Sequence, residues 1–338
     1  MSFHKIDLTH SMLKLVGRIS LLQERFSNMP IERKWVEQIR ENAIFGSTVA
    51  GLNLDGTRVT LKDQKEINKI QSTSIRQRVL NEIELRNSFP IYFKTEEFGI
   101  EQIHYLHRFL DNIYDEGAAQ RGKFRKSQEV EDAKVYKKLK SAIPRYGFLQ
   151  REVEEFAEII NAADIQAHVM AALVYANFIS LSPYSRGNSQ VGRILSKGYL
   201  FVKKFDIDQI LSIEPFFVQR KDRYYRYLNK YLMGKPSSWI EFYLKAVVQG
   251  YKDLAREVEL VSAGTIRPLE SQVIRLTDRQ RSIVELLKKN SQMSGSEVAT
   301  ILGVTRQNIF VIMQKLLEKK VVEKVGKGSA SRYKLRKS

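Results

Sequence analysis

A short polar segment between two apolar stretches carries the residues best suited to hold a phosphate. It begins at Ser182, ends at Arg193 and reads Ser-Pro-Tyr-Ser-Arg-Gly-Asn-Ser-Gln-Val-Gly-Arg. Gly187, Asn188 and Ser189 precede a predicted helix, so their backbone N–H groups and the helix N-terminus favour an anion. Because Arg193 lies one turn into that helix, these four residues predict a phosphate or nucleotide site. Gly187 and Asn188 suit a tight turn with an N-terminal cap equally well.

The same segment resembles the signature of the Fic (Fic/DOC) family, H-P-F-x-D/E-G-N-G-R-x-x-R, whose members typically transfer AMP from ATP to a protein hydroxyl. The residues that match letter for letter are Pro183, Gly187, Asn188 and Arg193. Tyr184 is a near match for the phenylalanine of the signature. Ser182, Arg186 and Gln190 stand where the resemblance implies the base, the metal ligand and a phosphate-binding arginine. The resemblance therefore implies a degenerate motif with no assignable catalytic residue.

These three replacements bear on the chemistry that the motif could support. Ser182 has no basic group near neutral pH, and loss of a positioned base costs about 10² to 10⁴ in rate. His168 lies fourteen residues upstream, about 21 Å along a helix, and we expect it on the helix surface. Arg186 repels Mg²⁺ but could hold a phosphate itself, and Gln190 lacks the charge of an arginine. We therefore expect no metal site and no Mg²⁺, and leave ATP or another nucleotide open as a ligand.

Many members of the family also carry an inhibitory helix, S/T-x-x-x-E-G/N, whose glutamate pairs with the last arginine of the motif. Residues 47–53, Ser-Thr-Val-Ala-Gly-Leu-Asn, resemble that segment. Ser47 occupies its first position, and Gly51 stands where the glutamate would be. The resemblance therefore implies an enzyme that needs no inhibition because it does not turn over, or else a deregulated enzyme.

The resemblance extends over about residues 40 to 260. A helix before the motif is resembled at His107–Leu110, and the segment leading to a substrate-docking flap at Gly122–Lys126. The closing helices of the family are resembled at Tyr224-Tyr225 and Trp239–Phe242. Apolar residues at helical spacing predict helices over 63–87, 100–114, 149–161, 164–180, 189–204 and 224–261. We therefore expect an all-α Fic-like helical domain, with a short β-hairpin flap as its one departure from helix.

Small residues and a proline interrupt the helical pattern at residues 262–268 and indicate a domain boundary. The predicted organisation is a helical region over 1–95, a Fic-like core over 96–261, a linker over 262–276 and a small α+β domain over 277–338. Residues 277–338 contain fourteen Lys or Arg and five Asp or Glu, and the whole chain has a net charge of +18. Such clustering is typical of a nucleic-acid-binding module.

The C-terminal segment resembles a winged helix-turn-helix. Helical patterns begin near Thr277, Ser294 and Thr305, Gly303 supplies a turn, and two strand-like runs flank residues 326–329. In that geometry the third helix enters the major groove. Base-reading residues would then be Thr305, Arg306, Gln307 and Asn308, and phosphate contacts would come from Lys327 and Arg332. A winged helix used for dimerisation or protein contact is the alternative interpretation.

The rest of the sequence limits the class of protein. The chain of 338 residues has no cysteine, which excludes disulfides and thiolate metal sites and fits a cytoplasmic protein. No apolar run has the length of a signal peptide or a membrane span. The leading hypothesis is a non-enzymatic DNA-binding regulator, with a homodimer on a two-fold site as one arrangement. A transferase with altered chemistry and a protein-interaction scaffold that docks a peptide at residues 123–130 remain alternatives.

Overall fold

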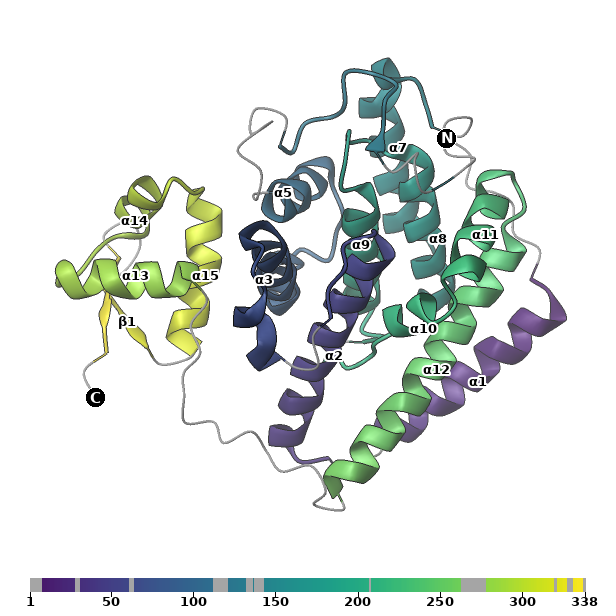
Figure 1. Ribbon diagram of the computed structural model, residues 1–338, viewed down its shortest axis with the longest axis horizontal. Coiled ribbons are helices and arrows are strands. Elements are labelled where there is room, and N and C mark those ends of the chain that lie inside the picture. Colours follow the sequence, from purple (N-terminus) through teal and green to yellow (C-terminus); the bar gives the residue numbers. More distant parts are fainter. Residues whose placement is uncertain are drawn as a thin grey trace. The chain divides into compact units, whose positions relative to one another are not determined.

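The computed structural model describes residues 8–27, 31–60, 64–111, 121–131, 136, 143–206, 208–262, 278–318, 321–326 and 331–336 (Figure 1). The described residues form two compact units, one built mainly from residues 1–268 and the other from residues 269–338. Each unit is described separately below. The predicted linker falls almost entirely on residues 263–277, which lie outside the described residues.

The larger unit is helical throughout its described residues. Its α-helices are α1 (His10–Ser27), α2 (Arg33–Leu54), α3 (Thr73–Asn87), α4 (Phe89–Tyr92), α5 (Ile100–Leu110), α7 (Leu149–Ala162), α8 (Ala167–Leu181), α9 (Asn188–Val202), α10 (Glu214–Val218), α11 (Lys221–Leu232) and α12 (Ser237–Ser262). The described residues of this unit also include the 3₁₀ helices η1 (Gln64–Lys69) and η4 (Tyr146–Phe148). No described helix of the chain is both long enough and apolar enough to cross a membrane.

Helices α8 and α9 form the centre of this unit. Almost every side chain of both helices is buried, so their sequences carry no polar stripe facing water. They pack against each other, and α5, α7, α11 and α12 pack around them. Figure 1 shows α1 lying along α12, with which it packs. The loop between α8 and α9 therefore rests on the most deeply buried part of the fold.

The structure corrects two predicted helices. The pattern over 63–87 is interrupted, because η1 ends at Lys69 and Ser72 caps a separate helix α3 by accepting a hydrogen bond from the Ile75 N–H. The pattern over 224–261 is split between α11 and α12 by Gly234, whose φ is 78°, and by Pro236. A proline in a helix interior removes a backbone hydrogen bond, and periodicity alone does not detect that cost.

The flap segment at residues 123–130 contains no strand. In the described residues the sheet is two-stranded and lies in the smaller unit. The expectation of a β-hairpin flap is therefore not met at residues 121–131, and most of residues 132–142 lie outside the described part of the chain. The remainder of the fold-class prediction for the larger unit, a helical domain, is confirmed.

The smaller unit contains α13 (Asp278–Lys289), α14 (Gly295–Leu302), α15 (Arg306–Glu318), β1 (Val322–Val325) and β2 (Arg332–Leu335). Ser294 and Glu297 form a capping box at the start of α14, and Gly303, with φ of 62°, ends that helix in the left-handed conformation. The strands are antiparallel, with Val322 opposite Leu335. These elements follow the predicted order of three helices and a hairpin.

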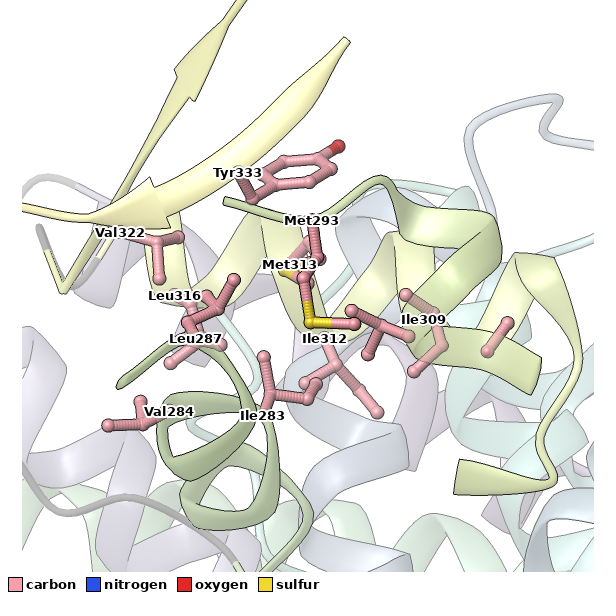
Figure 2. Packing of buried hydrophobic residues seen from close by; sticks show 12 residues of the cluster. Ile283, Val284, Leu287, Met293, Ile309, Ile312, Met313, Leu316, Val322 and Tyr333 are labelled. Carbon is pink, nitrogen blue, oxygen red and sulfur yellow. The ribbon is translucent and has the colours of Figure 1, made fainter. Parts of the chain in front are cut away.

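A separate apolar core holds the smaller unit together. Figure 2 shows the side chains of α13, α15 and the hairpin converging on one cluster. Its fully buried members include Ile283, Val298, Ile309, Ile312 and Leu316. Met293 pairs with Tyr333 through two backbone hydrogen bonds of 2.9 and 2.8 Å, which attach the segment before α14 to strand β2.

Candidate functional site

The loop from Ser182 to Gly187 is fixed by its own hydrogen bonds. Ser182 ends α8 with φ of 38°, is 0% exposed and donates its hydroxyl to the Ile179 carbonyl at 2.6 Å. Asn188 accepts from the Tyr184 N–H at 2.9 Å and donates to the Tyr184 carbonyl at 2.8 Å. Gly187 adopts φ of 76° directly before α9, a conformation that favours glycine. Ser182 and Asn188 thus both stabilise the turn.

Arg186 is paired with a carboxylate that the sequence analysis did not single out. Its Nε donates to Asp111 Oδ1 at 2.9 Å, and its Nη2 donates to Asp111 Oδ2 at 3.1 Å. Asp111 follows the last residue of α5 and caps that helix. This bidentate geometry is the strong form of an arginine–carboxylate pair. The guanidinium predicted to hold a phosphate therefore holds a side chain of the protein.

Arg193 is likewise paired within the fold. It is 3% exposed, its Nη1 donates to Asp55 Oδ1 at 2.9 Å, and its Nη2 donates to Asp55 Oδ2 at 2.5 Å. Nη1 also donates to Ser189 Oγ at 2.8 Å. Burial by itself lowers the pKa of this guanidinium, but the Asp55 carboxylate outweighs burial and raises the pKa well above its ordinary value. Arg193 therefore keeps its positive charge, and the Asp55 carboxylate balances that charge.

The segment that resembles an inhibitory helix lies against Arg193. A Cβ atom at Gly51 would be 2.9 Å from Arg193 Nε, so the glycine leaves room for the guanidinium. Arg193 Nε has no hydrogen-bond partner among the described residues. Asp55, one turn after Gly51, supplies the carboxylate. Ser47 lies one turn before Gly51 on α2, and its hydroxyl is 2.8 Å from Ser212 Oγ.

Two tyrosine hydroxyls contact Ser189, and a third tyrosine hydroxyl contacts both of them. Tyr136 and Tyr175 Oη lie 3.2 and 3.1 Å from Ser189 Oγ, and Tyr224 Oη is 3.3 Å from Tyr136 Oη. Tyr175 and Tyr224 are also hydrogen-bonded to each other. All four side chains are buried. Ser189, one of the predicted phosphate-binding residues, is therefore surrounded by protein hydroxyls.

Gln190 joins a buried chain of charges beneath the loop. Its amide donates to Glu82 Oε2 at 2.9 Å, and Arg86 Nη2 bridges Glu82 at 2.9 Å and Glu214 at 3.3 Å. Lys197 Nζ lies 3.7 Å from the second oxygen of Glu214. Burial raises the pKa of Glu214, but Lys197 and Arg86 outweigh it and bring the pKa to about 2. Among these residues only Gln190 was predicted from the sequence, because Glu82, Arg86 and Glu214 lie on other helices and Lys197, on α9 itself, lies beyond the loop motif.

A small cavity of about 10 Å³ adjoins these charges. Its polar lining residues are Ser47, Arg86, Lys197, Asp206 and Gln209. A volume of this size is at the lower limit for one water molecule. It is therefore too small for a nucleotide.

A histidine that the sequence analysis placed only in a helix lies directly under the loop. The His107 ring stacks on Tyr184 at a centroid distance of 3.8 Å. Its Nδ1 accepts from the Gly122 N–H at 2.9 Å, which places the proton on Nε2, 3.2 Å from the Arg186 carbonyl. Burial, as the main cause, lowers the pKa of His107 to about 4. The ring is therefore neutral at pH 7 and both nitrogens are engaged.

The segment expected to lead to a flap runs beside the loop. The Arg125 N–H donates to the Pro183 carbonyl and its Nε donates to the Ser182 carbonyl, both at 2.9 Å. Six residues later, the Glu131 N–H donates to the Ser185 carbonyl at 2.8 Å. These hydrogen bonds engage three backbone carbonyl groups of the loop and add to its rigidity.

In the smaller unit, the predicted base-reading residues begin α15. Thr305 Oγ1 accepts from the Asn308 N–H at 3.2 Å, which caps the helix, and Arg306 and Gln307 are exposed. Asn308, also predicted to read a base, is buried at 8% exposure because it lies on the core side of α15. Arg332 is exposed on β2, 3.7 Å from Glu297. Lys327 lies outside the described residues.

The described residues of the chain contain no group of three or more His, Cys, Asp or Glu side chains arranged to hold a metal ion.

Comparison with known proteins identifies relatives of this fold. The model of the Fic/DOC family matches residues 97–200, which include the loop. A Fic family protein from Desulfovibrio desulfuricans is similar in structure, with a TM-score of 0.60, 15% identity and 98% of each chain covered. Fic-1 from C. elegans has a TM-score of 0.60 and 15% identity over 75% of this chain and 73% of its own. A Fic domain-containing signalling protein from Bacteroides thetaiotaomicron has a TM-score of 0.56 and 11% identity, with 74% and 98% covered.

Proposed function

We propose that this chain is a DNA-binding regulatory protein. Its residues 97–200 form a Fic/DOC family domain, and in this proposal that domain no longer transfers nucleotides. The observation that carries the loss of transfer is Ser182. It stands at the position of the family base, is 0% exposed and uses its hydroxyl to end α8. Proton abstraction from a target hydroxyl requires a basic group within hydrogen-bond reach, and this side chain supplies none.

The two histidines nearest to the loop, His104 and His107, already make hydrogen bonds through Nδ1. His107 is close to the loop, but its Nδ1 lone pair accepts from Gly122 and its Nε2 proton faces the Arg186 carbonyl. His104 Nδ1 lies 3.0 Å from the buried Tyr184 hydroxyl. To act as a base at Nδ1, either ring would have to break the hydrogen bond made there.

The residues at the loop do not fit the Mg²⁺–ATP that the family uses. A guanidinium, Arg186, stands at the position of the metal ligand, and it neutralises Asp111 through two hydrogen bonds. Arg193 is neutralised in the same way by Asp55. An incoming phosphate would have to displace the Asp55 carboxylate from the buried Arg193 guanidinium, and the α9 N-terminus is then the remaining anion-binding group.

The smaller unit supports the DNA-binding part of the proposal. We interpret α14, the turn at Gly303 and α15 as a helix-turn-helix, and β1–β2 as its wing. The net positive charge of residues 277–338 favours a polyanionic partner. The first turn of α15 exposes Arg306 and Gln307, whose side chains can form paired hydrogen bonds with guanine and adenine.

The test of DNA binding is a titration of the full chain with duplexes selected from a random library. We expect Arg306→Ala to weaken binding of the selected duplex by roughly 5- to 150-fold, because a bidentate base contact contributes about 1–3 kcal/mol. Arg33→Ala, which also removes an exposed positive charge but from α2 of the larger unit, is the matched control. Equal weakening of selected and unrelated duplexes by Arg306→Ala would reassign Arg306 to a phosphate contact.

Incubation with labelled ATP and Mg²⁺ tests the loss of transfer. We expect no label on the chain or on added protein. Transfer by the unmodified chain that Arg193→Ala abolishes would favour the alternative, a transferase with altered chemistry. If neither DNA binding nor transfer is found, the protein-interaction scaffold becomes the leading hypothesis.

A further inference from the structure

Helix α15 carries a large apolar side chain that the core of the smaller unit does not use. Phe310 is 49% exposed. The other apolar side chains of this helix at Ile309, Ile312 and Leu316 are fully buried and point into the cluster drawn in Figure 2. Exposed apolar residues that occur singly need no explanation. The surroundings of Phe310 are what give it significance.

Phe310 lies among the side chains proposed to read bases. Residues three and four positions apart lie on the same face of a helix, so Arg306 and Gln307 are its neighbours on the preceding turn. Gln314 follows on the next turn and is partly exposed. The first acidic residue of α15 is Glu318, at its C-terminal end. This face of α15 therefore combines a cation, two amides and one aromatic ring, and neither the turn of α15 before Phe310 nor the turn after it carries an acidic residue.

That combination matches the chemical groups of the major groove. Arginine and glutamine pair with purine edges, whereas the C5 methyl of thymine offers an apolar contact that phenylalanine can make. Arg306 and Phe310 are four residues apart, which is about 6 Å along a helix axis. Base pairs are about 3.4 Å apart, so the two side chains would reach bases one or two steps apart.

We propose that Phe310 determines specificity by packing against the C5 methyl group of a thymine near the purine that Arg306 or Gln307 contacts. The inference rests on the proposed DNA binding and adds to it one base and one chemical group. When the helix enters the groove, the methyl group would cover the exposed face of the Phe310 ring.

The experiment removes the methyl group alone. Duplexes selected by the full chain are remade with each thymine replaced in turn by deoxyuridine, which keeps base pairing and lacks the C5 methyl. We expect about fourfold weaker binding at one or two positions, the effect of one buried methyl group. Phe310→Ala should bind the thymine and uracil duplexes equally well.

Ile301→Ala is the matched control, because Ile301 is an exposed apolar residue on the neighbouring helix α14, at 56% exposure. This variant should keep the discrimination between thymine and uracil, and circular dichroism should show both variants folded. If the full chain binds DNA but Phe310→Ala retains the same uracil penalty, or no thymine is sensitive, this inference is overturned alone. If the full chain binds no duplex, the proposed function fails and the inference fails with it.

Discussion

The cations of the α8–α9 loop and of the first turn of α9 are paired with carboxylates from distant helices. Arg186 pairs with Asp111, and Arg193 pairs with Asp55. A buried ion pair contributes little net stability compared with apolar residues, but removing one partner leaves a buried charge without compensation. Because the Arg193 side chain is 3% exposed and the Arg186 side chain is 28% exposed, Asp55 is the stricter structural requirement of the two acids.

Asp55→Ala tests this requirement. The variant leaves the buried Arg193 guanidinium unpaired, so we expect the free energy of unfolding to fall by about 3–5 kcal/mol. Urea denaturation measures this change. The double variant Asp55→Ala, Arg193→Met removes both charges and should recover part of the loss. A double variant less stable than Asp55→Ala would contradict a role for Asp55 in compensating Arg193.

His168 differs from our expectation of a residue on the helix surface. It is 4% exposed, its ring packs against Phe205, and neither ring nitrogen has a hydrogen-bond partner among the described residues. The reason is that α8 is buried on every side, so no face of it is free for a polar residue. Burial lowers the pKa of His168 from 6.5 to about 4.

This pKa gives a pH dependence of stability. Between pH 6.5 and 4 the unfolded chain protonates this histidine and the folded chain does not, so stability is lost as pH falls through this window. The loss should approach about 3 kcal/mol and end below pH 4. His168→Phe should reduce the difference in unfolding free energy between pH 7 and 4.5. His10→Phe, at an exposed position of α1, is the control; equal differences in all three proteins would refute the prediction.

At the scale of elements, close packing around α9 depends on glycine. A Cβ at Gly198 would lie 2.3 Å from the Phe93 ring, and Phe93 is itself fixed by ring contacts with Phe89 and Phe98. The ring has no free space to move into, because all three phenylalanines are buried. This contact places α9, and with it the loop, against the segment after α4.

Gly198→Ala should therefore destabilise the chain by about 1–3 kcal/mol, the usual cost of overpacking. Gly17→Ala is the matched control, since Gly17 also lies within a helix, α1, and nothing lies within 4 Å of its added methyl. We expect Gly17→Ala to stabilise the chain by up to about 1 kcal/mol because alanine favours helix. Thermal melts of both variants measure the difference; two changes of the same sign would contradict it.

At the scale of the whole molecule, the two units have separate apolar cores. Ile312 is fully buried in the smaller unit, and Ile103 is fully buried in the larger one. A core that is complete by itself can fold by itself. We therefore expect two unfolding transitions that respond to different mutations.

Ile312→Ala and Ile103→Ala test this independence as a reciprocal pair. Each should destabilise its own unit by about 2–5 kcal/mol, the usual cost of such a truncation, and leave the transition of the other unit unchanged. Differential scanning calorimetry with hydrogen exchange assigns each transition to its residues. A single transition lowered by both variants would mean that the units unfold together.

Much of this fold could be predicted from the sequence because helix signals are local. Apolar spacing located α7, α8 and α9 to within three residues at each end, and a capping serine at 294 or 296 located the start of α14. The breaks between η1 and α3 and between α11 and α12 were missed, since a cap or a proline outweighs periodicity there. The loop itself was located correctly, and its ligands remain untested predictions.

Local sequence patterns are enough to locate most of the helices, the loop and the concentration of positive charge at the C-terminal end. Which side chains the loop residues contact depends instead on how the helices pack. Asp55 is 138 residues from Arg193, Glu82 is 108 from Gln190, and Asp111 is 75 from Arg186. Helical spacing repeats within a few residues and carries no record of which distant carboxylate a buried cation will meet. That choice is made when the helices pack, because each buried charge must then find a partner.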